Sequence, residues 1–261
     1  MWDFEHTSLR REFDISYTVP SLCAEALRTG AADIGIIPAV AYAGIPGLVL
    51  VPDVAIAAKN SVRSILLVSK APLEKINSVA TDSSSRTSVA LAQILFQRWY
   101  GGERRLTSMQ PDLEKMMATA DAALLIGDSA LRVDRAKYYV YDLAAEWRHL
   151  TGKPFVFAFW AVREAALQSA SPNLDLAGIF QGSRDHGLQP KNLDTLAREW
   201  SPRIGLTPPA IKEYLTRNID YALDADNLEG LELFFRYAAE CGLIAHVPHL
   251  RFMEAATPAK T

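Results

Sequence analysis

The order of hydrophobic patterns along the chain is the feature that most restricts its fold. Up to residue 163, short hydrophobic runs with strand character alternate with segments of helical periodicity. Beyond that residue the helical pattern continues and no convincing strand appears. Alternating strands and helices are typical of α/β proteins with a largely parallel sheet. A chain of 261 residues is long enough for one large domain or two lobes. We therefore predict an α/β fold with a helical C-terminal region.

The first 75 residues predict one set of strands and helices. Strands are expected at Ile15–Val19 and Asp33–Ile37, on either side of a helix at Ser21–Thr29. Ser21 can cap this helix, and Pro38 can start the next one. The runs LVLVPDVAIAAK and VRSILLVSK supply two or three further strands.

The rest of the chain repeats this pattern and then changes. The expected strands are Ile76–Ala80, Ala122–Gly127, Tyr138–Asp142 and Pro154–Arg163, and the expected helices between them are Arg86–Trp99, Asp112–Ala118 and Leu143–Leu150. Five helices follow, at Glu164–Ser169, Leu174–Arg184, Leu193–Glu199, Pro208–Asn218 and Asn227–Cys241. This order predicts two lobes with a ligand cleft between them. Residues 1–75 and 163–261 form lobe 1, residues 76–162 form lobe 2, and the helical tail packs on lobe 1.

Charge and composition exclude several kinds of partner. The net charge of −3 gives no general attraction for nucleic acid or an anionic membrane. No hydrophobic run approaches the roughly 18 residues of a membrane span. The charged N-terminal segment lacks the hydrophobic core of a secretory signal, which favours the cytoplasm. Cys23 and Cys241 lie far apart among hydrophobic neighbours, so we expect buried free thiols.

A hydroxyl-rich turn is the strongest candidate for a binding site. The segment TDSSSRTS, residues 81–88, places six hydroxyl side chains and one arginine between an expected strand and an expected helix. Backbone N–H groups are free at a helix N-terminus, where the helix dipole favours negative charge. Ser83, Ser84, Ser85 and Thr87 can add hydroxyl donors and Arg86 can add charge, which predicts an anion site. A capping cluster explains the same residues equally well, because Ser and Asp favour such turns without any ligand.

Other positions beside strand ends have weaker signals. At the turn after the strand Ala122–Gly127, Gly127 permits a positive φ, and Asp128 or Ser129 can cap the next helix, which is the favoured interpretation of this turn alone. Arg63 interrupts a hydrophobic run and either forms an ion pair, which is slightly favoured, or faces the cleft toward a carboxylate. Tyr42 and Ser21 can line the cleft, although most residues in such places are structural.

The five histidines do not indicate a catalytic or metal site. None lies in these turns or at a catalytic spacing from a carboxylate or cysteine. No phosphate-binding glycine loop or dinucleotide fingerprint is present. The residues alone therefore predict a two-lobed protein that holds a small carboxylate or a similar anion, and they do not specify a reaction.

Five segments of the chain resemble the chorismate dehydratase family of the futalosine menaquinone pathway. They are VPSLCAEALRTGAADIGIIPAVAY, LVPDVAIAAKNSVRSILLVSK, TDSSSRTSVAL, ADAALLIGDSAL and PFVFAFWAVR. Their order and spacing agree over nearly the whole chain. The resemblance implies a two-lobed fold similar to type II periplasmic binding proteins, with a helical tail on lobe 1. It also implies a cytoplasmic hydro-lyase that converts chorismate to 3-[(1-carboxyvinyl)oxy]benzoate and water, without a cofactor or metal.

The resemblance also implies roles for individual residues. Matching motif positions assign substrate binding to Ser84, Ser85, Arg86, Thr87 and Gly127 together with Ser21 and Pro38 of lobe 1, and a cleft position to Asp128. Chorismate carries two carboxylates and becomes aromatic when it loses its ring hydroxyl and a ring proton. The enzyme therefore mainly orients a dianion and stabilises developing charge. Because no side chain stands out as a base, we expect the substrate's own enolpyruvyl carboxylate to take the proton, with Asp128 as the alternative.

The N-terminal segment departs from the family pattern. Family members open with a strand and a Ser-Tyr-Leu-Asn-like turn that lines the cleft, whereas Met1–His6 resembles the segment after that turn. A missing strand would leave its neighbour unpaired and part of the site absent. We therefore expect that residues encoded upstream raise the activity.

Two other functions fit the same residues. One is a non-catalytic binding protein of the same fold that takes a small carboxylate. The other is the sister lyase that acts on cyclic dehypoxanthinyl futalosine, which the Ser-Arg-Thr-Ser turn and the absence of a cleft histidine disfavour. All three functions have a small-molecule partner, and the sequence does not specify an oligomeric state.

Overall fold

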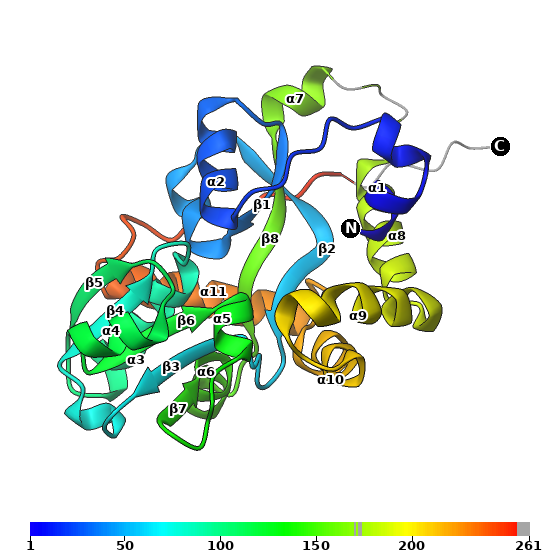
Figure 1. The fold of residues 1–261 in the computed structure, drawn as a ribbon. Helices are drawn as coiled ribbons and strands as arrows, with labels where there is room; N and C mark the ends of the chain where they lie inside the picture. Colours follow the sequence, from blue (N-terminus) through cyan, green and yellow to red (C-terminus); the bar gives the residue numbers. More distant parts are fainter. Residues whose placement is uncertain (170, 172–173, 255–261) are drawn as a thin grey trace.

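Two β-sheets form the frame of the protein, and helices surround them (Figure 1). The computed structural model describes residues 1–169, 171 and 174–254. The first sheet has the order β1-β8-β2, with β1 at Ile34–Pro38, β2 at Leu48–Ala58 and β8 at Phe155–Arg163. The second has the order β5-β4-β6-β3-β7, with β3 at Ile65–Ser69, β4 at Ser78–Asp82, β5 at Arg105–Met109, β6 at Ala122–Ile126 and β7 at Tyr139–Asp142. The predicted α/β class is confirmed.

The helices follow the predicted order closely. Those before β8 are α1 (Trp2–His6), η1 (Ser8–Arg11), α2 (Pro20–Thr29), η2 (Ala39–Gly44), η3 (Leu73–Lys75), α3 (Thr87–Trp99), α4 (Leu113–Thr119), α5 (Gly127–Leu131) and α6 (Leu143–Thr151). Those after β8 are α7 (Glu164–Ser169), α8 (Leu176–Gly187), α9 (Pro190–Ile204), α10 (Pro208–Glu213), the π-helical turn η4 (Tyr214–Asn218) and α11 (Ala225–Glu240). The helical C-terminal region is therefore confirmed.

The first sheet is antiparallel and the second is mixed, so the prediction of a largely parallel sheet is wrong. Among the strands of the described residues, only the pairs β4–β5 and β4–β6 are parallel. In the first sheet β1 and β2 both pair antiparallel with β8, and in the second β3 pairs antiparallel with β6 and β7. In the first sheet the reason is that the chain leaves at the end of β2 through one short connection and returns at the start of β8 through another, so these two strands run in opposite directions. We call these connections the first crossing segment, residues 59–64, and the second crossing segment, residues 152–154.

The strand pairing also bears on the predicted division into lobes. The boundaries at residues 75/76 and 162/163 place β3 in lobe 1 and β8 almost entirely in lobe 2. The hydrogen bonds instead join β3 to the second sheet and β8 to the first. By sheet membership the two lobes meet at the two crossing segments, and the division into lobes stays a prediction in that shifted form.

Two segments differ from the prediction in their local structure. The strand expected at Ile15–Val19 is absent, and residues 14–19 form no regular element. Within the described chain β1 is an end strand that pairs only with β8, so this segment has no ladder to join. In contrast, the edge strand β5 is not predicted, because its sequence is largely polar and exposed and gives no hydrophobic run.

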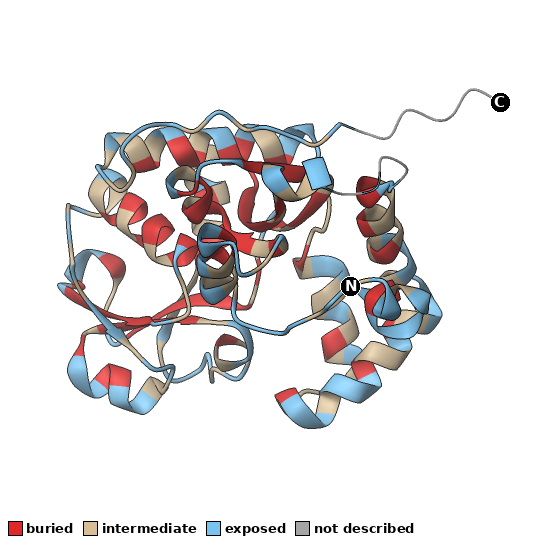
Figure 2. Ribbon diagram, turned by 90° about the horizontal axis from the view of Figure 1, so that it is seen from above, coloured by how far each residue is buried: buried red, intermediate tan, exposed pale blue. Residues whose placement is uncertain are grey.

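Helix α11 packs against elements of both sheets. The ring of Phe234 lies 5.2 Å from Phe155 of β8, and Tyr237 lies 5.8 Å from Trp99 of α3 and 5.9 Å from Trp147 of α6. Buried side chains of the two sheets, α3 and α11 belong to one continuous hydrophobic core. The buried residues in Figure 2 accordingly follow the inner faces of the helices and the strands.

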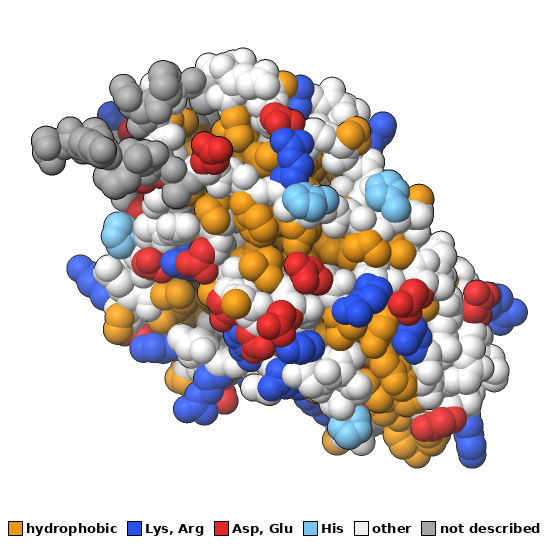
Figure 3. Space-filling view, turned by 180° about the vertical axis from the view of Figure 1, so that it is seen from behind, with side chains coloured by type: hydrophobic (Ala, Val, Ile, Leu, Met, Phe, Trp, Pro, Cys, Tyr) orange, Lys and Arg blue, Asp and Glu red, His pale blue; other side chains and the backbone are white. Residues whose placement is uncertain are grey.

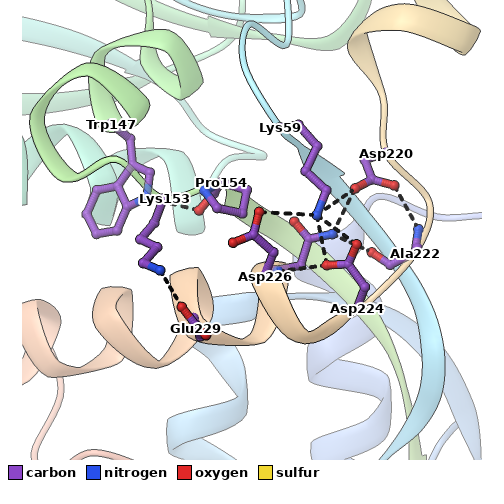
Figure 4. Close-up of polar contacts among 10 residues, drawn as sticks. Lys59, Trp147, Lys153, Pro154, Asp220, Ala222, Asp224, Asp226 and Glu229 are labelled. Atoms are coloured by element: carbon purple, nitrogen blue, oxygen red, sulfur yellow. Dashed lines mark hydrogen bonds and ion pairs between the residues drawn. The ribbon is translucent and has the colours of Figure 1, made fainter.

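The first crossing segment is tied to the start of α11 by a lysine among three carboxylates (Figure 4). The amine of Lys59 lies 2.8 Å from Asp224, 3.6 Å from Asp220 and 3.8 Å from Asp226. These groups remain partly exposed, so each single pair stabilises the fold only weakly. Together they hold the end of β2 at the N-terminus of α11.

The second crossing segment is tied to the same helix more closely. Lys153 forms an ion pair with Glu229 of α11, and the indole N–H of Trp147 donates a hydrogen bond of 3.0 Å to the carbonyl oxygen of Pro154 (Figure 4). A Cβ atom added to Gly230 of α11 would lie 2.2 Å from that same oxygen. The helix therefore approaches the crossing backbone as closely as a glycine permits.

The back of the molecule is amphipathic. Hydrophobic side chains form a band between acidic and basic groups on this face (Figure 3). No helix in the described part of the chain is long and hydrophobic enough to cross a membrane.

Candidate functional site

Three turns that carry predicted residues lie side by side on one edge of the second sheet. In the parallel pair β4–β6, Thr81 lies opposite Leu124, and in the antiparallel pair β3–β6, Ile65 lies opposite Ile126. The ends of β4 and β6 and the start of β3 are therefore neighbours. We give the name junction edge to three stretches: residues 83–86 between β4 and α3, residues 127–128 at the start of α5 directly after β6, and residues 62–64 before β3.

Helix α3 begins on the junction edge with no side-chain cap. Within the described residues, no side chain accepts from its first N–H groups. The carboxylate of Asp82 instead accepts from the backbone N–H of Ser84 at 2.9 Å and from its hydroxyl at 2.6 Å, which shapes the turn before the helix. The dipole of this 13-residue helix favours negative charge at the uncapped end. This arrangement favours the anion-site interpretation of the turn over the capping interpretation.

Ser85 carries a buried hydroxyl in this turn. Its oxygen is buried and has no hydrogen-bond partner among the described residues. A buried hydroxyl without a partner costs free energy, and a bound carboxylate would remove that cost. The hydroxyl of Ser84, in contrast, already donates to Asp82.

Thr87 and Pro38 are brought together across the two sheets. The N–H of Val40, two residues after Pro38, donates to the hydroxyl oxygen of Thr87 at 3.3 Å. Pro38 ends β1 and directly precedes η2, so its predicted place at a helix start is confirmed. The hydroxyl of Tyr42 binds the carbonyl oxygens of Leu48 and His249, which is the structural role expected of most such residues.

Arg86 lies at the start of α3, and Ser21 lies in the first turn of α2. Arg86 is exposed at the start of α3, and its charge contributes slightly to the lowered pKa of Glu25, which is caused mainly by Arg28. Ser21 lies one helical turn before Glu25 on the same face of α2. Ser21 is not the cap of α2, because the helix already begins at Pro20.

The turn between β6 and α5 has a different chemistry from the hydroxyl turn. Gly127 adopts a φ of 59°, and its N–H donates to the carbonyl oxygen of Ser64 at 2.8 Å, so this donor is already used. Asp128 is exposed and does not cap α5, so the favoured capping interpretation is wrong. Its charge adds to the raised pKa of Tyr214, which is caused mainly by burial.

Residues 62–64 are fixed by a carboxylate from the start of α6. Asp142 accepts from the N–H of Val62 at 3.1 Å and from that of Arg63 at 2.7 Å. It also accepts from the first N–H groups of α6 and so caps that helix. The first crossing segment and helix α6 therefore share one anchor.

Tyr214 is a site residue that the sequence does not reveal. Its hydroxyl donates to Ser64 at 3.0 Å, which connects the π-helical turn η4 with the junction edge. Burial raises the pKa of Tyr214, the hydrogen bond to Ser64 and the charge of Arg63 oppose this, and Asp128 adds to it. The phenol is therefore a neutral hydrogen-bond donor. The segment Pro208–Asn218 reads as an ordinary helix, so no sequence signal marks the turn.

The remaining candidates of the sequence lie away from this edge. His186 binds Asp3 at 2.8 Å, and the ring of His6 stacks on Trp2. Both cysteines are free, as predicted, but they are half-buried rather than fully buried. The described residues include no group of three or more side chains that could hold a metal ion.

A cavity of about 450 Å³ lies elsewhere, and none of the predicted site residues lines it. Its lining includes one cation, Arg184, which pairs with Asp53 at 3.0 Å and with Asp185 at 2.8 Å. Asp220 adds a further carboxylate. This net negative lining disfavours a dianion, so the junction edge is the better candidate.

Comparisons with known proteins identify the family. A family model described as menaquinone biosynthesis matches residues 1–240. The chain belongs to this family. The resemblance noted in the sequence is thereby confirmed.

Two relatives in the menaquinone biosynthesis family have assigned names. A chorismate dehydratase from Thermus thermophilus is 29% identical over 248 residues, which cover 88% of this chain and 88% of that protein. A chorismate dehydratase from Campylobacter jejuni is 37% identical over 119 residues, or 44% of this chain and 40% of that protein.

Solved structures support the fold. Protein AF1704 from Archaeoglobus fulgidus superimposes with a TM-score of 0.67 at 14% identity, covering 93% of this chain and 94% of that chain. The periplasmic aliphatic sulphonate binding protein SsuA from Escherichia coli superimposes with a TM-score of 0.61 at 15% identity, covering 95% and 85%. These similarities confirm the predicted periplasmic-binding-protein-like fold for this member of the menaquinone biosynthesis family.

Proposed function

We propose that this protein is a chorismate dehydratase, a hydro-lyase that converts chorismate to 3-[(1-carboxyvinyl)oxy]benzoate and water. The match of the menaquinone biosynthesis family over residues 1–240, with relatives that carry this name, is the observation on which the proposal depends. The uncapped start of α3 and the unpartnered hydroxyl of Ser85 support it, because both suit a carboxylate. The proposal keeps the cytoplasmic location and the single small-molecule substrate that the resemblance implies.

In the proposed mechanism the protein orients the substrate, and aromatisation drives the reaction. One substrate carboxylate accepts from the first N–H groups of α3 and from Ser85, while Thr87 and Arg86 add a hydroxyl donor and positive charge. Pro38 at the end of β1 and Ser21 in α2 are the proposed contacts from lobe 1, and Gly127 lets the backbone approach. A ring C–H loses its proton, the neighbouring C–OH bond breaks, and the hydroxide takes up the proton to leave as water. Fixed donors stabilise the negative charge that builds up toward the ring carboxylate.

The proposed base is the enolpyruvyl carboxylate of the substrate. Held near the ring proton, it is an internal base that needs no side chain. Asp128 is the alternative, since it is an exposed carboxylate on the same edge as the start of α3. His186 and His6 are poor candidates, because His186 is bound to Asp3 and His6 stacks on Trp2.

We also propose that a further strand adds to the free side of β1 in the fully active enzyme. Three observations support this: β1 is an end strand, residues 14–19 stay outside the sheet, and Tyr17 and Leu22 are 76% and 60% exposed. Adding the residues encoded upstream should raise the dehydratase activity. Equal activity with and without them would contradict the strand.

The test of the proposed function is direct. The purified protein is incubated with chorismate, and the aromatic enolpyruvyl benzoate is followed by liquid chromatography and mass spectrometry, with protein-free chorismate as the control. Formation of this product at a rate proportional to the protein concentration is the expected result. Tight binding of chorismate without product would favour the binding-protein alternative, and neither binding nor product would refute both.

A further inference from the structure

Arg63 has an unusual backbone conformation for a residue with a side chain. Its φ is 62°, and within the described chain Asp53 is the other residue besides glycine with a positive φ. This left-handed region is strained for residues with a Cβ atom and free for glycine. Strained residues of this kind cluster at functional sites.

The strain at Arg63 is imposed by its surroundings. Asp142 accepts from the N–H groups of both Val62 and Arg63, and Ile65 directly enters β3 opposite Ile126. The chain is therefore held on both sides of the strained residue. A glycine would adopt this φ with less strain. The backbone therefore does not explain the arginine, and the explanation lies in a role of its side chain.

The side chain of Arg63 has no partner in the described part of the protein. It is half-buried, and its guanidinium group forms neither an ion pair nor a hydrogen bond with the residues that the structure describes. Asp128, the carboxylate whose charge also acts on Tyr214, is not within ion-pair distance. A guanidinium group has five N–H donors in a fork that matches a carboxylate. The slightly favoured expectation of an ion pair with a lobe partner is therefore wrong.

The distance between Arg63 and the start of α3 suits a ligand with two carboxylates. The two lie on the same edge, with β6 between β4 and β3. Neighbouring strands are about 4.8 Å apart, so the two points are separated by roughly 10 Å before the side chains reach inward. Ser64, held by Tyr214 and by Gly127, fixes the backbone next to Arg63.

From this geometry we propose that Arg63 binds the second carboxylate of a dicarboxylate substrate while the start of α3 binds the first. Two-point binding makes the junction edge selective for dianions over monoanions. The inference rests on the proposed function for the identity of the natural substrate, and it concerns binding rather than turnover.

The test compares two simple probes by isothermal titration calorimetry. Isophthalate carries two carboxylates and benzoate carries one. In Arg63→Gln and Arg63→Gly the affinity for isophthalate should fall about 10- to 100-fold, as expected for a lost charge-assisted pair, while the affinity for benzoate stays within about threefold. Arg135→Gln removes the same charge from an exposed turn after α5 and should leave both affinities unchanged.

The glycine variant separates binding from folding. Because glycine relieves the strained φ, Arg63→Gly should unfold at the same temperature as the wild type or higher. An unchanged affinity for isophthalate in the Arg63 variants would overturn the inference, and so would an equal loss for both probes or a wild type that binds no dicarboxylate. If the wild type binds isophthalate through Arg63 but leaves chorismate intact, the proposed dehydratase is wrong and the inference stands. If the variants turn over chorismate with the same KM as the wild type, the inference is wrong and the proposed dehydratase stands.

Discussion

The close approach of α11 to the second crossing segment predicts the effect of one methyl group. In an exposed helix, replacing glycine with alanine stabilises a protein by about 1 kcal/mol. In Gly230→Ala the new Cβ would lie 2.2 Å from the carbonyl oxygen of Pro154 and 3.2 Å from its carbon, both backbone atoms. The helix or the crossing segment has to move by about 1 Å. Overpacking of this kind costs about 1–3 kcal/mol.

The same movement would break a buried hydrogen bond. The Pro154 oxygen accepts from the indole N–H of Trp147, a fully buried side chain, at 3.0 Å. An orphaned buried donor costs about 1–3 kcal/mol. With the gain in helix propensity subtracted, we expect Gly230→Ala to lower the free energy of unfolding by about 1–5 kcal/mol. The structure thus reverses the sign that helix propensity alone predicts.

Urea denaturation followed by circular dichroism measures this effect, with a matched control in another helix. Gly182 lies inside α8, and a Cβ added there would meet nothing within 4 Å. Gly182→Ala should therefore raise the free energy of unfolding by about 0.5–1 kcal/mol. If Gly230→Ala is as stable as the wild type, the close packing of α11 on the second crossing segment is refuted.

Three further predictions concern the site and the stability. Ser85→Ala should lower kcat/KM for chorismate about 10- to 100-fold without lowering the unfolding midpoint, because the lost hydroxyl has no partner in the described protein; an unchanged kcat/KM would exclude Ser85 from the site. Asp128→Asn should keep turnover within a few fold, as judged by initial rates, and retained binding with lost turnover would identify Asp128 as the base. Hydrogen bonds from the N–H of Asn77 and then from the hydroxyl of Ser78 lower the pKa of Asp121. Its contribution to stability is therefore complete above about pH 4 and is lost as the pH falls through the lowered folded-state pKa. Urea titrations should show that Asp121→Asn destabilises the protein more at about pH 6 than at about pH 3, and an equal effect at both would contradict this assignment.

The sequence predicts those parts of the fold that have a strong local signal. Helix α11 and strand β8 are expected within a few residues of their observed bounds, because a long helical period and a run of aromatic and β-branched residues are hard to misread. Strand direction depends on which sheet each strand enters, and the hydrophobic pattern carries no information about that. The antiparallel strand pairs and the shifted lobe boundaries therefore come from the structure alone.

The candidate site, like the fold, can be predicted from the sequence only where the signal is local. The hydroxyl turn is readable because Ser85, Arg86 and Thr87 are contiguous and precede a helix. Asp142 binds Arg63, which is 79 positions away in the chain, and Tyr214 binds Ser64, which is 150 positions away. The roles of Asp142 and Tyr214 therefore depend on contacts between distant parts of the chain. A single sequence offers no local pattern for such contacts.

On the junction edge, two neighbouring residues have nearly the same φ, but one has no side chain and the other has a long charged one. Gly127 has a φ of 59° and Arg63 a φ of 62°. A Cβ atom at Gly127 would meet nothing within 4 Å, so the conformation rather than crowding explains the glycine there. Arg63 carries the conformational penalty that Gly127 avoids. The backbone of both turns would accept glycine, so the two positions differ in the guanidinium group. This group is half-buried and has no partner among the described residues. A ligand that supplies a carboxylate best explains why an arginine occupies this strained position.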